Sequence, residues 1–473
     1  MKILPPVAVV ALSLIAATET SAADSSPGRE AFRALYQELV EIDSSSDTGS
    51  CTKVVHAAES RLKAAGFSSD EVHVLIPDGK PDDGNIVARI RSKSANGARN
   101  PKKGVLLLAH IDVVNAKRED WERDPFRLVE ENGYFYGRGA SDDKAMAAVF
   151  LDLMIRLKQE SSFRPRRDLV LALTCGEETS NRVNGVDFLL QNHRELIDAD
   201  FALNEGAGGL LSPQGTPLSL EIQAGEKIHQ VFALEVTNPG GHSSRPVPDN
   251  AIYRLAVATQ KIAGLSFPIQ VNPVVREYLR VTGPMLGGEL GAAMSALAKD
   301  PQDASALAVL TKDPNYNPLL HTTCVATQID GGHAPNALPQ RATLTLSCRV
   351  MQDMSLDRVK EILEQAIADP QVKVSIVRRR QGSPAPPLTA EIMDPVRAQA
   401  KKLWPGVPVT PIMLVGATDG RYLMNAGIPT YGMSGMFSIP GEANAHGLNE
   451  KIRVKSLYEG RDFLEAVVRA YLK

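Results

Sequence analysis

The sequence has few cysteines and little net charge. The first argues against a small scaffold held by disulfides, and the second argues against a nucleic-acid-binding protein. The 473 residues include four cysteines, which are too few for a disulfide framework at this length. Cys324 and Cys348 lie in two strand-like runs that could face each other, so a disulfide is possible there, but we favour two free, buried thiols. A formal net charge of −3 provides no basic field, so we expect no nucleic-acid partner.

Long apolar runs are also missing beyond the N-terminus, which leaves no later candidate for a membrane span. At the N-terminus a single lysine precedes the apolar stretch Ile3–Ala17, and small residues follow it. This layout predicts a secretory signal over residues 1–22, with cleavage after Ala22 or Ala23. An uncleaved membrane anchor is the alternative, but the run is short for a span. We therefore expect a secreted or periplasmic protein with no membrane attachment after cleavage.

The first half of the chain alternates strand and helix patterns. Hydrophobic residues make up 43% of the sequence and charged residues 23%, as in an ordinary globular protein with a large core. Apolar strand runs separated by amphipathic helical segments are typical of an α/β domain with a largely parallel sheet. The strand patterns cover 84–92, 103–114, 166–176 and 200–206, and the helical patterns cover 29–66, 143–159 and 185–196.

The pattern changes near Glu226. Residues 229–244 and 341–350 alternate apolar and polar side chains, which indicates a sheet with one exposed face, and helical stretches lie between and after them. A separate α+β domain is therefore predicted over 226–384, inserted into a catalytic domain that comprises 27–225 and 385–473.

Acidic and histidine side chains follow several of the predicted strands. Ligands of open α/β sheets bind at the carboxyl ends of the strands, where carboxylates without a cation repel one another. Imidazole and carboxylate together suit zinc, so the pattern predicts a site for two Zn²⁺ ions, with Co²⁺ or Mn²⁺ as possible replacements. The residues are His110 and Asp112, Asp142 and Asp143, the adjacent pair Glu177 and Glu178, Glu205, and the distant His446.

The spacing of His110 and Asp112 favours a joint role. Two residues apart on a strand, their side chains point to the same face, so one can bind metal while the other orients its ring.

The motifs AHIDVV, YGRGASDDK, CGEETS, NEG, GGHSS and NALP…CRV occur in this order. In their order and their residues, these motifs resemble those of the co-catalytic di-zinc exopeptidases and deacylases. That family includes glutamate carboxypeptidase, carboxypeptidase S, carnosinase, aminoacylase and succinyl-diaminopimelate desuccinylase. The resemblance runs from about residue 30 to the C-terminus. It implies a zinc-exopeptidase-like α/β/α catalytic domain with an inserted α+β, ferredoxin-like domain that serves as a lid and in dimerisation.

The resemblance also implies individual roles in the metal centre. Asp112 buttresses His110, Glu177 is the general base, and the peptide between Asp142 and Asp143 is cis. The implied ligands are Asp142 as the bridge, His110 and Glu205 at one zinc ion, and Glu178 and His446 at the other.

Substrate contacts are implied in the same way. His242 of the inserted domain, often from a partner subunit in relatives, polarises the scissile carbonyl. Asn336 and Arg349 match positions that hold the substrate's carboxylate, a role that suits the planar fork of arginine. Thr418 matches a substrate-binding loop. Residues 285–313 form a helical extension of the insert that is longer than in the smaller relatives, a candidate to remodel the pocket mouth or the dimer interface.

These observations favour an exported di-zinc metallohydrolase that cleaves an amide or peptide bond next to a free carboxylate. We favour a carboxypeptidase or dipeptidase, with an N-acyl-amino-acid deacylase as the alternative. A periplasmic binding protein that lost turnover is a rival from another class. The expected partners are a small peptide or N-acyl amino acid and, through the inserted domain, a second copy of the chain.

Overall fold

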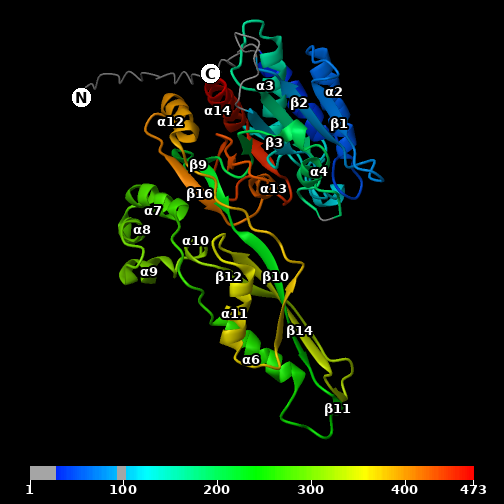
Figure 1. Cartoon of the computed structure of the whole chain (residues 1–473), viewed down its shortest axis with the longest axis vertical. Helices are drawn as coiled ribbons and strands as arrows, with labels where there is room; N and C mark the ends of the chain where they lie inside the picture. The colour runs from blue at the N-terminus through cyan, green and yellow to red at the C-terminus, as the bar shows by residue number, and fades with distance from the viewer. Residues whose placement is uncertain (1–27, 93–102, 180) are drawn as a thin grey trace, which may run out of the picture.

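The computed structural model describes residues 28–92, 103–179 and 181–473. Two sheets divide the molecule, a large mixed sheet in the upper body and a small antiparallel sheet in the lower one (Figure 1). The predicted signal over 1–22 lies outside the described residues. Among the helices that are described, none has the length and apolarity to cross a membrane.

The large sheet contains the buried strands that the sequence predicts. β3 (Val105–His110) lies between β6 (Leu169–Thr174) and β7 (Phe201–Asn204), and all three are parallel. Because side chains alternate along a strand, Leu107 faces one layer of helices while Leu106 and Leu108 face the other. The remaining strands are β1 (Val72–Leu75), β2 (Asn85–Ile90), β8 (Gly209–Leu211), β9 (Pro217–Glu226), β16 (Val409–Leu414), β17 (Thr430–Gly432) and β18 (Phe437–Ser438).

Helices cover both faces of this sheet, which confirms the α/β/α prediction. The larger core lies under one layer of helices and a smaller core lies under the other. The first layer contains α1 (Arg29–Glu41), α2 (Cys51–Ala64), α3 (Lys144–Gln159), α12 (Ala390–Leu403) and α14 (Val454–Tyr471). The second contains α4 (Gly185–Asn192), α5 (Arg194–Ile197) and α13 (Gly420–Asn425).

The small sheet has a ferredoxin-like topology. Its chain order is β10 (Ile228–Thr237), α6 (Ala251–Ala263), β12 (Thr323–Gly331), β14 (Arg341–Val350), α11 (Leu356–Ile367) and β15 (Lys373–Val377). The spatial order is β12-β14-β10-β15, and every pairing is antiparallel. Phe232, Leu234 and Val236 are buried in a core that also contains residues of α6 and α11, whereas the alternate residues of β10 face outward. The predicted alternation is therefore confirmed along 229–237 and 341–350, whereas 238–244 lie beyond β10.

The helical extension is longer than predicted. Four helices stand between α6 and β12, and they begin before residue 285: α7 (Pro273–Leu286), α8 (Gly288–Lys299), α9 (Ala304–Leu310) and α10 (Asn317–Leu320). α7 packs on β16 of the large sheet, so the extension contacts the catalytic body as well as the small sheet's core.

The chain passes between the two bodies twice. β9 of the large sheet ends at Glu226 and β10 of the small sheet begins at Ile228, so Lys227 alone separates them. The return runs from the end of β15 at Val377 to the start of α12 at Ala390. Below, the inserted domain from β10 to β15, with α6 to α11, is called the lid.

The cysteine prediction is wrong, because all four cysteines are paired. The β12–β14 register places Cys324 opposite Cys348, and the two form a disulfide, where we favoured free thiols. A second disulfide joins Cys51, at the start of α2, to Cys175, directly after β6. Its partners are 124 residues apart, and only the packing of α2 near the end of β6 brings them together.

Candidate metal centre

The parallel strands of the large sheet end at one edge and deliver the acidic residues there. His110 is the last residue of β3, Glu177 and Glu178 follow β6 closely, and Glu205 directly follows β7. Asp142 lies just before α3, where the peptide between Asp142 and Asp143 is cis, as the resemblance implied. Their convergence follows from the topology, since parallel strands present their carboxyl ends together.

The five predicted ligands form two groups that share Asp142. His110, Asp142 and Glu205 form one group, and Asp142, Glu178 and His446 form the other, with the donor atoms of each group within 4.8 Å of one another. His110 Nε2 lies 3.1 Å from Asp142 Oδ1 and 3.8 Å from Glu205 Oε1. His446 Nε2 lies 3.2 Å from Asp142 Oδ2 and 2.9 Å from Glu178 Oε2. One carboxylate thus faces both imidazoles with different oxygens, as a bridge requires.

Asp112 links the first histidine to the acid pair. The Nδ1 of His110 donates to the main-chain oxygen of Asp112 at 3.1 Å, and the Asp112 carboxylate lies 3.7 Å from the same nitrogen. That carboxylate accepts the main-chain N–H of Glu177 at 3.2 Å and of Glu178 at 3.0 Å. Asp112 is fully buried, so it fixes the direction of the ring and of the turn that carries both glutamates.

The electrostatics of the cluster indicate a place for cations. Burial, with Asp419 nearby, raises the pKa of Glu177 to about 9, and burial together with neighbouring carboxyls raises the pKa of Glu205 to about 8. Hydrogen bonds to Asp142 and Glu178 raise the pKa of His446 to about 10. These pKa values are raised because negative charge is crowded in a dry place, and a divalent cation relieves the same crowding. Two imidazoles and three carboxylates fit a pair of zinc-type ions.

Glu450 is a supporting residue that the sequence analysis missed. Its buried carboxylate accepts the main-chain N–H groups of Gly139, Ser141 and Asp142 at 2.7 to 3.0 Å and pairs with Arg138 at 2.7 Å. Glu450 therefore fixes the glycine-rich turn that presents Asp142. Its position, four residues after His446, is the only signal in the sequence, and it gives no indication of these partners.

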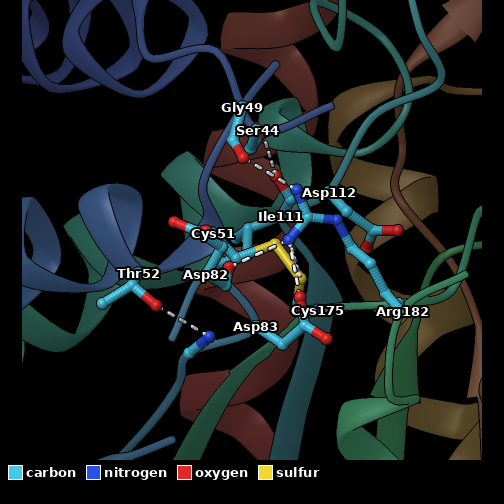
Figure 2. The surroundings of a disulfide bond; sticks show 12 residues. Ser44, Gly49, Cys51, Thr52, Asp82, Asp83, Ile111, Asp112, Cys175 and Arg182 are labelled. Atoms are coloured by element: carbon cyan, nitrogen blue, oxygen red, sulfur yellow. Dashed lines mark hydrogen bonds and ion pairs between the residues drawn. A yellow bond between two sulfur atoms is a disulfide. The ribbon is translucent and has the colours of Figure 1, made fainter. Parts of the chain in front are cut away.

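The disulfide between Cys51 and Cys175 ends two residues before the acid pair in the chain, and Figure 2 shows its surroundings. Arg182 fills the space beside it, donating to Asp83 at 2.7 Å and to the main-chain oxygen of Gly49 at 2.9 Å. The main-chain N–H of Cys175 donates to the side chain of Asn85 at 2.9 Å. The turn with both glutamates is thus tied covalently to α2 on one side and by Arg182 on the other.

His242 and Asn336 lie far from the metal ligands of their own chain. His242 lies in β11 (Gly241–His242), which pairs with β13 (Ala337–Leu338) directly after Asn336. Figure 1 shows β11 at the end of the lid opposite to the large sheet that carries β3. Both residues are exposed, and among the described residues the ring of His242 forms side-chain hydrogen bonds only with Ser244.

Arg349 and Thr418 differ in their access to a substrate. Arg349 lies on the face of β14 turned away from the lid's core, opposite His229 and Thr323, and forms no ion pair within the described part of the chain. Thr418 is 3% exposed, and its hydroxyl and main-chain N–H both donate to Glu226. Thr418 is therefore buried behind the residues that line the site.

A cavity of about 900 Å³ opens beside the acid pair. Glu177 and Glu178 line one end, and both connections to the lid contribute cationic groups, among them Lys227 and Arg380. α13 adds Arg421. The cavity lies between the large sheet's helices and the lid, where a substrate can reach the acid pair.

Solved structures share this architecture. An M20 family metallo-carboxypeptidase, Sso-CP2 of Sulfolobus solfataricus, superposes with a TM-score of 0.64 at 19% identity, over 93% of this chain and 99% of that one. At this identity the likeness concerns the fold: an α/β body with a large mixed sheet and a separate lid.

Sequence relatives extend the comparison. The N-fatty-acyl-amino acid synthase/hydrolase PM20D1 of Mus musculus is 27% identical over 360 residues, 74% of this chain and 71% of the relative. Aminoacylase-1A of Rattus norvegicus is 23% identical over 442 residues, 92% of this chain and 93% of the relative.

Fold and cluster together define a metal-dependent hydrolase of peptide or amide bonds. Residues 106–470 match the model of peptidase family M20/M25/M40, and the chain belongs to this family. The resemblance seen in the sequence is thereby confirmed, and the rival of a binding protein without turnover is set aside.

Proposed function

We propose that this enzyme cleaves the amide bond between an acyl or peptidyl group and a carboxyl-terminal amino acid. The observation that carries the proposal is the arrangement of His110, Asp142, Glu178, Glu205 and His446 in two groups that share Asp142, with Glu177 beside them. A pair of divalent ions fits this donor set, zinc first by ligand type, with cobalt or manganese as replacements.

Glu177 moves the proton in the proposed reaction. The metal pair supplies Lewis-acid activation of water near neutral pH. Glu177 lies in the turn fixed by Asp112 but belongs to neither ligand group, so its carboxylate is free to accept the proton of the attacking water. It then returns the proton to the departing amine, as a general base that becomes a general acid.

Arg349 supplies recognition of the free carboxylate. Its guanidinium has no anionic partner in the described part of the chain, and a planar guanidinium pairs bidentately with a carboxylate. This favours a carboxypeptidase that accepts blocked amino acids and longer peptides. We propose Asn336 and Thr418 as further contributors, Asn336 at the carboxylate and Thr418 by shaping the loop beside Glu177.

An N-acyl-amino-acid hydrolase is the second candidate. Two relatives favour it, because PM20D1 is named an N-fatty-acyl-amino acid synthase/hydrolase and the other is named an aminoacylase. The chemistry is the same, and only the group on the carbonyl side differs.

We propose that two copies of the chain assemble through the lid. β12 is an edge strand of the small sheet, and Val325 and Ile329 on it are 60% and 68% exposed. Tyr253 and Val257 of the adjacent α6 are also exposed. An unpaired edge beside an apolar helix face is a typical pairing surface. In such a dimer, the distant His242 of one copy serves the metal centre of the other.

The two disulfides and the predicted signal favour export. Disulfides form and persist in oxidising compartments, and every cysteine of this chain is paired. We therefore propose a secreted or periplasmic enzyme.

The experiment that tests the site compares the mature enzyme with Glu177→Gln. We expect about two metal ions per chain in both proteins, and a loss of kcat of roughly a hundred- to ten-thousandfold in the variant, because it lacks the proton acceptor. Metal analysis and hydrolysis of N-acetyl amino acids measure the two quantities. Absence of bound metal from both proteins would overturn the proposal.

A substrate panel separates the branches. N-blocked dipeptides, N-acyl amino acids and free dipeptides are compared by kcat/KM at equal pH and metal concentration. Blocked substrates should exceed free dipeptides because Arg349 reads the carboxylate and needs no free amine. A preference for free dipeptides contradicts the carboxypeptidase branch and leaves the metal centre standing.

A further inference from the structure

An apolar groove lies between the helical extension and the large sheet. It measures about 880 Å³ and is bounded by α7, α10 and β16 with the residues that follow β16. Most of its lining is apolar, chiefly Val275, Tyr278, Leu319, Ile412, Met413 and Val415. The helical extension therefore forms one wall of this groove.

The groove adjoins a second hollow at the metal ligands. This hollow of about 460 Å³ is lined by Asp142 and Glu205. Glu221, Ile412, Leu414 and Pro440 line both hollows. A substrate held at the metal ligands can therefore place one of its groups in the groove.

Arg349 stands in the wall of the same groove. It is half-buried and without an ion pair in the described residues, and burial together with Arg380 lowers its pKa. A half-buried cation without a partner calls for an anion. In the proposed reaction that anion is the carboxylate of the amino acid released, whose side chain then lies next to Arg349.

We infer that the apolar groove selects substrates whose carboxyl-terminal residue has a bulky apolar side chain, such as leucine, methionine or phenylalanine. The inference rests on the proposed function and adds its substrate class. Neither the metal ligands nor Glu177 distinguishes one carboxyl-side residue from another. The walls built by α7 and α10 do, because they offer apolar surface in the same groove that Arg349 lines.

Glu221 provides the competing possibility. Its carboxyl lies at the junction of the two hollows and forms no side-chain hydrogen bond or ion pair in the described part of the chain. A basic side chain could lay its methylene stem along the apolar wall and pair with Glu221. Lysine and arginine substrates therefore form the arm of the test that can overturn the inference.

The first experiment measures kcat/KM for N-acetyl derivatives of alanine, leucine, phenylalanine, lysine and glutamate. Burying a leucine or phenylalanine side chain in the groove predicts an advantage over alanine of roughly ten- to a hundredfold. A flat series overturns the inference, and so does a preference for lysine that disappears in Glu221→Gln.

Two variants link the preference to the groove. Leu319→Trp fills it, so the phenylalanine-to-alanine ratio of kcat/KM should fall at least about tenfold. Tyr278→Ala widens it and should move the optimum to larger side chains such as tryptophan. Ile76→Trp, at a position 40% exposed just after β1 and outside the groove, is the matched control and should keep the ratio. A ratio unchanged in both groove variants overturns the inference.

A binding measurement keeps the inference separate from the proposed reaction. Calorimetry on metal-loaded Glu177→Gln compares N-acetylphenylalanine with N-acetylalanine. If the variant binds N-acetylphenylalanine more tightly than N-acetylalanine but wild type hydrolyses neither, the groove is supported and the proposed function is overturned. Turnover without any such preference overturns the groove and leaves the proposed function standing.

Discussion

The large sheet and the lid position polar residues in different ways. At the edge of the large sheet, His110, Glu178 and Glu205 meet because three neighbouring parallel strands end there. In the lid, His242 and Asn336 lie in or next to the short two-stranded pairing of β11 with β13 at the tip, far from any metal ligand of the same chain (Figure 1). The first arrangement is completed by one chain's own topology, whereas the second depends on where the whole domain lies.

The disulfides follow the same division. Cys51–Cys175 closes a separation of 124 residues and reaches the turn of the acid pair, while Cys324–Cys348 joins neighbouring strands only 24 residues apart. The first therefore constrains the metal centre and the second constrains the lid alone. If this division is right, changes in the two regions should affect different measured quantities.

The largest expected effect outside the metal centre belongs to His242. His242→Ala should lower kcat by roughly a hundred- to a thousandfold, as expected for the loss of an oxyanion donor, while metal content stays unchanged. Steady-state kinetics with metal analysis measures this.

Mixing two inactive variants shows which chain supplies His242. If it acts across a dimer, mixed dimers of His242→Ala and Glu177→Gln contain one complete site. Refolding an equal mixture should then recover about a quarter of wild-type activity, because about half of the dimers are mixed and each has one of two sites intact. A mixture that stays inactive contradicts the proposal that His242 of one copy serves the metal centre of the other.

Removing each disulfide should separate stability from metal affinity. Loop entropy predicts a loss of about 5 kcal/mol for Cys51→Ala/Cys175→Ala and about 3.5 kcal/mol for Cys324→Ala/Cys348→Ala. Only the first pair should also weaken zinc binding, by about tenfold or more, because it loosens the turn that carries Glu178. Urea unfolding and zinc titration of the apo proteins measure both. Equal zinc affinity in the two double variants would contradict the division.

The smallest effect concerns acid stability. Burial opposes ionisation of Glu442, but hydrogen bonds from Arg453 and Tyr134 outweigh it and lower the pKa from 4.5 to about 2. A lowered folded pKa adds stability above the unfolded value, and this is lost as the pH falls from about 4.5 to about 2, up to about 3 kcal/mol. Glu442→Gln should flatten the fall of stability across that window.

The matched control is Asp357→Asn, which breaks an exposed lid pair with Arg379. Exposed pairs contribute little to stability, so its acid unfolding should follow wild type. Unfolding midpoints between pH 6 and pH 2 provide the comparison. A curve for Glu442→Gln that coincides with wild type would mean that its pair contributes nothing.

The sequence predicts the strands of the large sheet and the ligand residues at their ends well, because the patterns involved are local. Apolar runs mark buried strands, and His110 and Glu205 follow them within a residue, so the convergence needs only a parallel sheet. A sheet with one exposed face is likewise visible in the alternation along β10 and β14, whereas the ferredoxin-like topology came from the family resemblance.

What escaped prediction depends on contacts between distant segments. The pairing of Cys51 with Cys175 needs the position of α2 relative to β6, which no periodicity encodes. Glu450 acts through three main-chain N–H groups of a turn far away in the sequence, and the residues next to Glu450 do not indicate these contacts. The apolar groove depends on how α7 and α10 lie against β16, so the helical pattern alone predicted the helices but not the groove.

The junction of β9 and β10 gives the enzyme a mechanical property. Glu226, at the end of β9, holds the main-chain N–H and hydroxyl of Thr418. The next residue, Lys227, donates to the main-chain oxygen of His321 in the lid at 2.7 Å. Two consecutive residues therefore link the position of the lid to the position of the loop before α13, so the orientation of the domain and the geometry of that loop are set together.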